Sequence, residues 1–403
     1  MKVLVVYNRY RHRVHGEEVV VDTSMQLLRD HGVDVSLHVR SSEGLQHSPW
    51  NKLVAGVAGI YNPASRRRLS KELAALRPDV IHAHNLYPWI SPSALIAAKR
   101  ANIPVVMTVH HYGLTCPVLT HFRHGRVCTD CVTTSELSCV RNNCRDSHIE
   151  SALYALRAAV ARRMRWFLDH VSVFVALSEF SKRQLVAAGF PADRIVIRPN
   201  MVNVLKEQPA ATEGGYVAYA GRITYEKGVD LLCEAARAAN LPLRIAGDVS
   251  GWPELQRDHA DHVQFEGILR DGALDSFYRN ARMLVVPSRW WEVCPLVVLE
   301  AMNLGVPVLA ARTGGLPEMI EDGLSGLLFE PGHRSDLADK MRLLWNDAQL
   351  RHRCVAAARI RVTEKYDAGR YIYDLMSIYS LARERSVGGA QGRPGIDDSV
   401  RTP

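Results

Sequence analysis

Long apolar runs are missing from this sequence of 403 residues. No stretch approaches the roughly 20 apolar residues that a membrane-spanning helix requires. The opening segment Met1–Tyr7 has one lysine and an apolar run too short for the core of a signal peptide. We therefore expect a cytoplasmic protein whose eight cysteines stay reduced and form no disulfide framework.

Several common motifs are absent as well. The sequence has no G-x-G-x-x-G and no G-x-x-x-x-G-K-[ST], so it carries neither a dinucleotide fingerprint nor a phosphate-binding P-loop. H-E-x-x-H and G-x-S-x-G are also missing, which disfavours zinc metalloproteases and serine hydrolases.

Length and composition predict two compact domains. With 47% hydrophobic and 23% charged residues, both halves of the chain can bury a core. The formal net charge is +8, which favours anionic partners such as nucleoside diphosphates, acidic lipid surfaces or nucleic acid, without choosing among them.

Short apolar runs alternate with amphipathic segments of helical length, a pattern typical of a doubly wound parallel sheet. In residues 1–203 the pattern predicts a helix at Glu17–Asp30. It predicts strands at Val3–Tyr7, Val33–Val39, Val80–Ala83, Val105–Val109, Val171–Leu177 and Ile195–Ile197.

A polar stretch, 204–215, is interpreted as a linker to a second α/β domain at 216–365. Its predicted strands are Tyr216–Ala220, Leu243–Ala246, Val263–Phe265, Met283–Val286, Val306–Ala310 and Leu327–Phe329. Residues 366–385 should form a helix that packs back on the first domain, and residues 386–403 a disordered tail. The expected fold is therefore two Rossmann-like α/β domains facing across a cleft.

The segment Trp291–Met302 carries the strongest chemical signal. Pro295 suits the first turn of a helix, which places Glu292 in the loop after a strand and Glu300 on the second helical turn. Ligands bind at that edge of an open α/β sheet. Free N–H groups near Leu296 and Val297 would face an anion, and the two carboxylates suit sugar hydroxyls. In isolation, E-x7-E more often marks two solvated glutamates.

A second signal follows the first strand of the second domain, at Gly221–Gly228. It places Arg222 and Lys227 at a strand end, where they would neutralise a diphosphate. The alternative is a plain loop with two exposed cations, but the flanking glycines favour close approach of the backbone.

Together these segments resemble the retaining glycosyltransferases of family 4, which have the GT-B fold. The resemblance extends to about Asp374. Further matching pieces are Arg198-Pro199-Asn200, Pro287-Ser288, Gly305-Val306-Pro307-Val308, Gly314-Gly315-Leu316-Pro317-Glu318 and Gly323-Leu324-Ser325-Gly326-Leu327-Leu328.

The resemblance implies a role for each matching residue. Arg222 and Lys227 would hold the diphosphate of a UDP- or GDP-sugar, and Glu300 the ribose. Glu292 would hold the transferred sugar. It would do so together with backbone groups of the following helix start, at Cys294, Pro295, Leu296 and Val297. Gly16 would approach the diphosphate from the first domain, where many members have two glycines and this chain has His15-Gly16.

The resemblance also assigns His110, at a strand end in the acceptor-side first domain, to the active site. Family chemistry is described as front-face displacement, in which the leaving phosphate takes the acceptor's proton. No cofactor is then required, and the acceptor would be a glycan, a lipid or a small molecule and not a nucleic acid. A GT-B epimerase or phosphorylase and a catalytically silent nucleotide-binding scaffold remain as alternatives.

Residues 112–148 form an insert with an unusual set of cysteines. The C-x2-C pair Cys128 and Cys131, flanked by Cys116 and Cys144, has the ingredients of a structural zinc site, with Cys139 to spare. Reduced thiols on a loop are the alternative. The resemblance accordingly points to a subgroup with a cysteine-bearing insert.

Two basic stretches suggest peripheral contact with the inner face of a membrane. They are Arg66-Arg67-Arg68 with Lys71, and Arg157, Arg162, Arg163 and Arg165 with Trp166 and Phe167. Solvated basic faces are the more common explanation of such runs.

Overall fold

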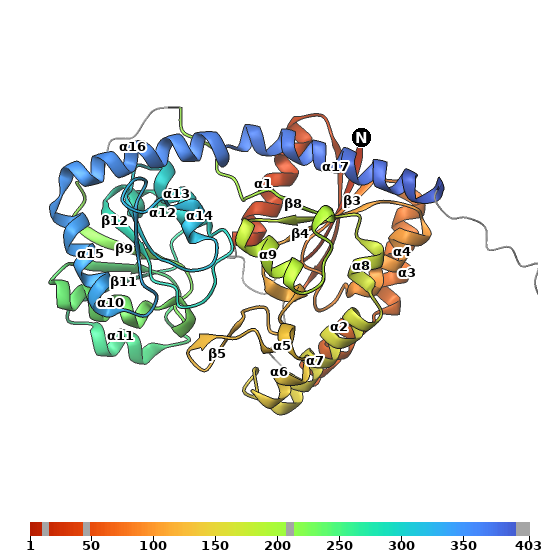
Figure 1. Ribbon diagram of the computed structural model, residues 1–403, viewed down its shortest axis with the longest axis horizontal. Coiled ribbons are helices and arrows are strands. Elements are labelled where there is room, and N and C mark those ends of the chain that lie inside the picture. Colours follow the sequence, from red (N-terminus) through yellow and green to blue (C-terminus); the bar gives the residue numbers. More distant parts are fainter. Residues whose placement is uncertain (10–15, 43–48, 207–212, 392–403) are drawn as a thin grey trace, which may run out of the picture.

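The computed structural model describes residues 1–9, 16–42, 49–206 and 213–391. It has two α/β lobes side by side, and two long helices run along one side of both (Figure 1). The predicted pair of Rossmann-like domains is confirmed.

The first domain is built on a parallel sheet with the strand order β2-β1-β3-β4-β7-β8. Its strands are β1 (Lys2–Arg9), β2 (Asp34–Ser41), β3 (Val80–Ala83), β4 (Val105–Val109), β7 (Val173–Ala176) and β8 (Ile195–Ile197). The strands β3, β4 and β7 are buried throughout, as continuous apolar runs predict for strands that are covered on both faces.

Alternate residues of β1 divide the core of this domain into two layers. Leu4 and Val6 pack on one side of the sheet and Val3 and Val5 on the other. The helices of the domain are α1 (Gly16–Asp30), α2 (Pro49–Ile60), α3 (Pro63–Leu76), α4 (Leu95–Arg100), α7 (His148–Arg163), α8 (Trp166–His170) and α9 (Glu179–Ala187). The insert adds β5 (Phe122–Arg123), β6 (Arg126–Val127), α5 (Asp130–Thr133) and α6 (Leu137–Arg141).

The second domain repeats the plan with the strand order β11-β10-β9-β12-β13-β14. Its strands are β9 (Tyr216–Ala220), β10 (Leu243–Ala246), β11 (Val263–Gly267), β12 (Ala281–Val286), β13 (Val308–Ala311) and β14 (Leu327–Phe329). Its helices are α10 (Val229–Ala239), α11 (Pro253–His259), α12 (Asp271–Arg279), α13 (Leu296–Asn303), α14 (Leu316–Met319), α15 (Arg334–Asn346) and α16 (Ala348–Lys365). Because β9 and β12 are neighbours, the loops after both strands open at the same edge of the sheet.

The last helix, α17 (Ala368–Gln391), crosses to the first domain and packs against α1 and against the strands β3, β4 and β7. Tyr371 accepts a hydrogen bond from Ser24, and the Tyr379 hydroxyl lies 2.7 Å from Nδ1 of His82. The expected disordered tail from residue 386 is wrong for 386–391, which are helical. Helix propagation adds one hydrogen bond per residue, and no proline intervenes before Pro394. Residues 392–403, and 207–212 of the predicted linker, lie outside the described residues.

A carboxylate of the second domain caps a helix of the first. Glu318 accepts hydrogen bonds from the backbone N–H groups of Glu179 at 2.7 Å and Phe180 at 2.6 Å. These amides are in the first turn of α9, where an anion also gains from the helix dipole. The contact ties the two domains together beside the loops that carry the predicted site.

Candidate active site

Lys227 ends a single 3₁₀ turn, Tyr225–Lys227, that follows β9. The next residue, Gly228, has a φ of +71°, and a Cβ atom built on it would lie 2.0 Å from the carbonyl oxygen of Pro287. Only glycine fits here, so the loop after β9 presses against the loop after β12.

Glu292 is buried, and one of its carboxylate oxygens receives three hydrogen bonds. Oε1 accepts from Lys227 Nζ at 2.6 Å, from Ser288 Oγ at 2.5 Å and from Trp290 Nε1 at 2.9 Å. Burial by itself would raise the pKa of Glu292, but the charge of Lys227 and these three donors outweigh it and hold the pKa below its ordinary value. Glu292 is therefore an anion paired with a cation.

Trp290 connects the two predicted diphosphate-binding cations. The Lys227 ammonium nitrogen lies 4.9 Å from the centre of the indole ring, and the Arg222 guanidinium carbon lies 5.2 Å from it. Both distances suit a cation–π contact. The side chain of Arg222 is 47% exposed and that of Lys227 18%, so a ligand from solvent would meet Arg222 first.

Helix α13 begins at Leu296, and Pro295 is its N-cap residue. The expectation that Pro295 lies in the first turn is therefore wrong by one position. The amides of Leu296 and Val297 are in the first turn, where N–H groups have no acceptor inside the helix. A Cβ atom built on Gly16 would lie 3.6 Å from the Leu296 side chain, so the start of α1 in the first domain approaches the start of α13.

Cys294 and Glu300, the other two predicted residues of this segment, each accept a hydrogen bond from a neighbouring side chain. The carbonyl oxygen of Cys294 accepts from Asn200 Nδ2 at 2.7 Å, and burial raises the pKa of its thiol to about 12. Glu300 accepts from the Tyr278 hydroxyl at 3.1 Å, and burial raises its pKa above the ordinary value. The two glutamates of E-x7-E thus differ, because Glu292 has a cationic partner and Glu300 a neutral one.

The glycine pair Gly314-Gly315 supports the Glu292 loop, a role that the sequence did not predict. A Cβ atom on Gly314 would lie 2.2 Å from the backbone oxygen of Glu292, and one on Gly315 would lie 2.1 Å from that of Val293. The Gly315 N–H donates to the Glu292 carbonyl oxygen at 2.7 Å. The two adjacent glycines, followed by Glu318, are the sequence feature that could have indicated this close backbone contact.

His110 belongs to a buried group of histidines in the first domain. Its Nε2 lies 2.9 Å from Nδ1 of His84, whose ring centre is 4.2 Å from that of His82. Burial, reinforced at His110 by neighbouring histidines, lowers the pKa of His82 and of His110 to about 3. His110 is therefore neutral at physiological pH.

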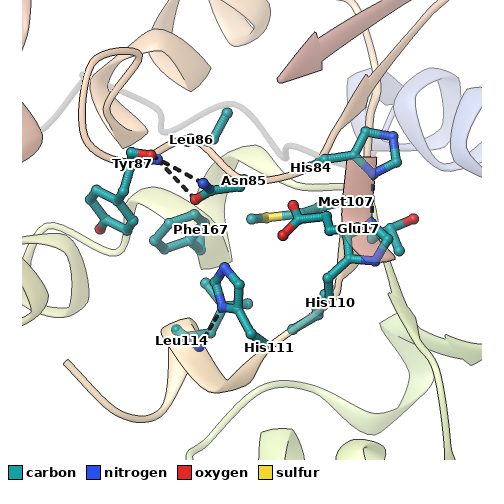
Figure 2. Close-up of a pocket in the computed structure, with 13 residues that line it drawn as sticks. Glu17, His84, Asn85, Leu86, Tyr87, Met107, His110, His111, Leu114 and Phe167 are labelled. Carbon is teal, nitrogen blue, oxygen red and sulfur yellow. Dashed lines mark hydrogen bonds between the residues drawn. The ribbon is translucent and has the colours of Figure 1, made fainter. Parts of the chain in front are cut away.

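A pocket opens beside His110 (Figure 2). In this view Glu17, His84 and His110 lie toward one side of it, and Tyr87 and Phe167 toward the other. Glu17 is the second residue of α1, so the same helix start that approaches Leu296 also lines this pocket.

An aromatic cluster joins the His110 segment and the insert to the Glu292 loop. The ring of Trp291 lies 5.9 Å from that of Tyr112 and 5.3 Å from that of His121. The Tyr112 hydroxyl donates to the Glu292 carbonyl oxygen at 3.5 Å. Residues from both domains therefore surround the loop that carries Glu292.

The four predicted zinc ligands line one pocket together with a fifth thiol. The five are Cys116, Cys128, Cys131, Cys139 and Cys144. However, among the residues that the structure describes, no group of three or more histidine, cysteine or acidic side chains is arranged to hold a metal ion. A hydrogen bond between Cys139 and Cys144 lowers the pKa of Cys144. The zinc site stays a prediction.

Trp166, Phe167 and Arg157 of the second predicted basic stretch are buried, so they are not the membrane-facing side chains expected there. Both rings are 6% exposed, and Arg157 is buried with its guanidinium donating to the carbonyl oxygen of Pro117. The chain turns at Arg165, which has a φ of +51°, and this directs the following aromatic side chains into the core. None of the described helices is long and apolar enough to cross a bilayer.

Each of the two domains matches a glycosyltransferase family. Residues 14–205 match the family model for Glycosyltransferase Family 4, and residues 203–361 match that for Glycosyl transferases group 1. The chain therefore belongs to the family 4 type of glycosyltransferases with the GT-B fold.

Particular relatives agree with this class. The sulfoquinovosyl transferase SQD2 of Arabidopsis thaliana is 28% identical over 85% of this chain and 66% of its own length, so the chain spans about two thirds of it. HepE of Anabaena, in complex with UDP-glucose, superposes with a TM-score of 0.64 at 18% identity over 94% of this chain and 99% of its own. The sucrose-phosphate synthase of Thermosynechococcus elongatus gives 0.70 at 16% identity over 97% and 100%. The two structures establish likeness of fold.

The buried neutral histidines predict a loss of stability in acid. Unfolded histidines bind protons near pH 6.5, whereas His82 and His110 do so only near pH 3 in the fold. Between these values the unfolded state holds more protons, so the free energy of unfolding should fall with falling pH, by up to about 1.4 kcal/mol per pH unit for each histidine. Urea unfolding of the wild type and of His82→Gln at pH 7 and pH 5 should give the variant the shallower dependence. An equal dependence contradicts the assignment, and His352→Gln, at an exposed position, is the control.

If the insert thiols close on a metal, protein purified without a histidine tag should contain about one equivalent of zinc. Cys131→Ser should lower this content at least about tenfold, because a thiolate ligand is lost. Cys354 is a buried cysteine of α16, outside the insert, so Cys354→Ser should leave the zinc content unchanged. Less than about a tenth of an equivalent in the wild type contradicts the zinc site.

Proposed function

We propose that this glycosyltransferase moves a sugar from a nucleoside diphosphate, UDP or GDP, to a glycan, lipid or small-molecule acceptor, with retention of configuration at the anomeric carbon. The proposal rests on the cluster of Arg222, Lys227 and Glu292 at the start of α13. The complexes of HepE with UDP-glucose and UDP support a nucleotide-sugar donor.

When the donor binds, Lys227 would exchange its contact with Glu292 for a contact with the diphosphate. A diphosphate carries more negative charge than the single carboxylate of Glu292, and the first-turn amides of α13 favour it further. Lys227 would turn to the phosphates beside Arg222. Glu292 would keep its bonds from Ser288 and Trp290, and its freed acceptor capacity would go to a sugar hydroxyl.

In the proposed transfer, the bond between the anomeric carbon and the β-phosphate oxygen breaks. The acceptor oxygen bonds to the same face of that carbon, and the departing phosphate takes the acceptor proton. Arg222 and Lys227 would stabilise the charge that grows on the diphosphate. No protein base is needed, which agrees with the pKa of His110, lowered by burial to about 3, because so weak a base would hold the acceptor's proton poorly.

The pocket beside His110 would receive the acceptor. A neutral imidazole can donate or accept a hydrogen bond, so His110 would position a hydroxyl without adding charge. The rival functions, an epimerase and a silent scaffold, gain nothing from relatives such as SQD2, which is named as a transferase.

The direct test is to supply UDP- and GDP-sugars with lipid, polysaccharide and small-molecule acceptors, and to follow nucleoside diphosphate release and the anomeric proton by NMR. An α-linked donor should give an α-linked product. A β-linked product contradicts retention, and interconversion of the donor sugar without release of nucleoside diphosphate contradicts transfer.

Removing the ammonium group should weaken the donor complex. Lys227→Ala should reduce the affinity for the nucleoside diphosphate by on the order of 2–4 kcal/mol, because a partly buried phosphate loses its charge partner. Isothermal titration of the nucleoside diphosphate measures this, with Lys365→Ala, at an exposed end of α16, as the control. Wild-type affinity in Lys227→Ala counts against the diphosphate role.

Glu292→Gln should lower turnover and leave the affinity for the nucleoside diphosphate unchanged. The amide keeps the shape but loses the charged acceptor for the sugar, so turnover should fall by about two orders of magnitude or more while nucleoside diphosphate affinity is retained. If affinity falls and turnover per bound donor does not, Glu292 does not hold the sugar.

A further inference from the structure

Helix α2 exposes an apolar stripe. Trp50, Leu53, Val54 and Val57 follow a spacing of three, one and three residues, so they share one helical face. Tyr61 directly follows the end of the helix, and its N–H donates to the Val57 carbonyl oxygen. All five side chains are exposed, Trp50 to 68% and Val57 to 53%. An amphipathic helix in a soluble domain normally turns such a face inward.

The opposite face of α2 explains why this stripe faces outward. Ala55 is buried, and a Cβ atom on Gly56 would lie 3.0 Å from Leu153 of α7, while one on Gly59 would lie 3.2 Å from Arg157. Small residues thus let α2 lie close against α7, its neighbour at the bottom of Figure 1. Helix α7 also exposes Ile149 to 72% and Leu156 to 50%.

Positive charge adjoins one end of the stripe. The Arg66 guanidinium carbon lies 5.6 Å from the centre of the Tyr61 ring. Arg67 and Lys71, on the same helix α3, are exposed. Within the described part of the chain, none of these three cations forms a salt bridge, whereas the neighbouring Arg68 is paired with Glu72. The charges are therefore available to an anionic partner.

We propose that this face of the first domain, formed by the α2 stripe and the α3 cations, docks on an anionic lipid surface. A helix lying flat on the domain presents its apolar side chains at one depth, which suits the boundary between headgroups and acyl chains. Trp50 and Tyr61, at the two ends, have the amphipathic rings that favour that boundary. The unpaired cations match acidic headgroups. The proposal goes beyond the transfer reaction and does not depend on it.

Vesicle flotation of the full chain tests the proposal. The wild type should float with vesicles containing about a third phosphatidylglycerol and much less with pure phosphatidylcholine. Leu53→Ser/Val57→Ser should lower the bound fraction at least about tenfold, since two inserted apolar side chains are lost. Leu343→Ser/Ile360→Ser, at exposed positions of the second domain, is the matched control and should float like the wild type.

Arg67→Ala/Lys71→Ala keeps the stripe and should lower binding to the acidic vesicles only. The exposed positions of these variants predict wild-type melting temperatures, which check folding. Wild-type protein that stays unbound with both vesicle types overturns the proposal, as does flotation of Leu53→Ser/Val57→Ser at the wild-type level. Sedimentation velocity covers the remaining case: a wild-type dimer that becomes a monomer in Leu53→Ser/Val57→Ser, without vesicle binding, shows that the face joins two copies and also overturns it.

Discussion

The contact between Lys227 and Glu292 is the interaction on which the proposed donor site depends. Burying a carboxylate is costly unless a cation and hydrogen bonds compensate, and here one ammonium, one hydroxyl and one indole N–H meet a single oxygen. The pair keeps Glu292 ionised and aimed before a donor arrives. It also leaves a cation that a more highly charged ligand can take over.

The fold brings this pair together through strand order. Because β9 and β12 are neighbours in the sheet, the loops that carry Lys227 and Glu292 meet at the carboxyl ends of the strands. Gly228, Gly314 and Gly315 remove the side chains that would hold the backbones apart. Glu318, just beyond the glycine pair, then ties the same region to α9, so the donor loop and the first domain share one set of contacts.

Local signals in the sequence predicted both sheets and the strand ends at which Arg222, Lys227 and Glu292 lie, since apolar runs, strand-end motifs and a family resemblance are all local. Contacts between distant segments could not be predicted. The spacing of residues in the sequence does not predict that Tyr379 contacts His82 or that Trp290 contacts two cations. It also does not predict that Trp166 is buried. The α2 stripe was missed for the same reason, because an apolar helical face looks like core until its neighbours are known. The cysteines of the insert line one pocket, and the zinc site inferred from their spacing stays a prediction.

A crystal structure of the protein with a nucleoside diphosphate sugar tests the central claim most directly. We expect Lys227 Nζ to leave Glu292 and to lie within hydrogen-bonding distance of a phosphate oxygen. Arg222 should lie beside the same diphosphate, and Glu292 should accept a hydrogen bond from a hydroxyl of the sugar. Phosphates bound elsewhere, with the Lys227–Glu292 contact still at 2.6 Å, would contradict the claim.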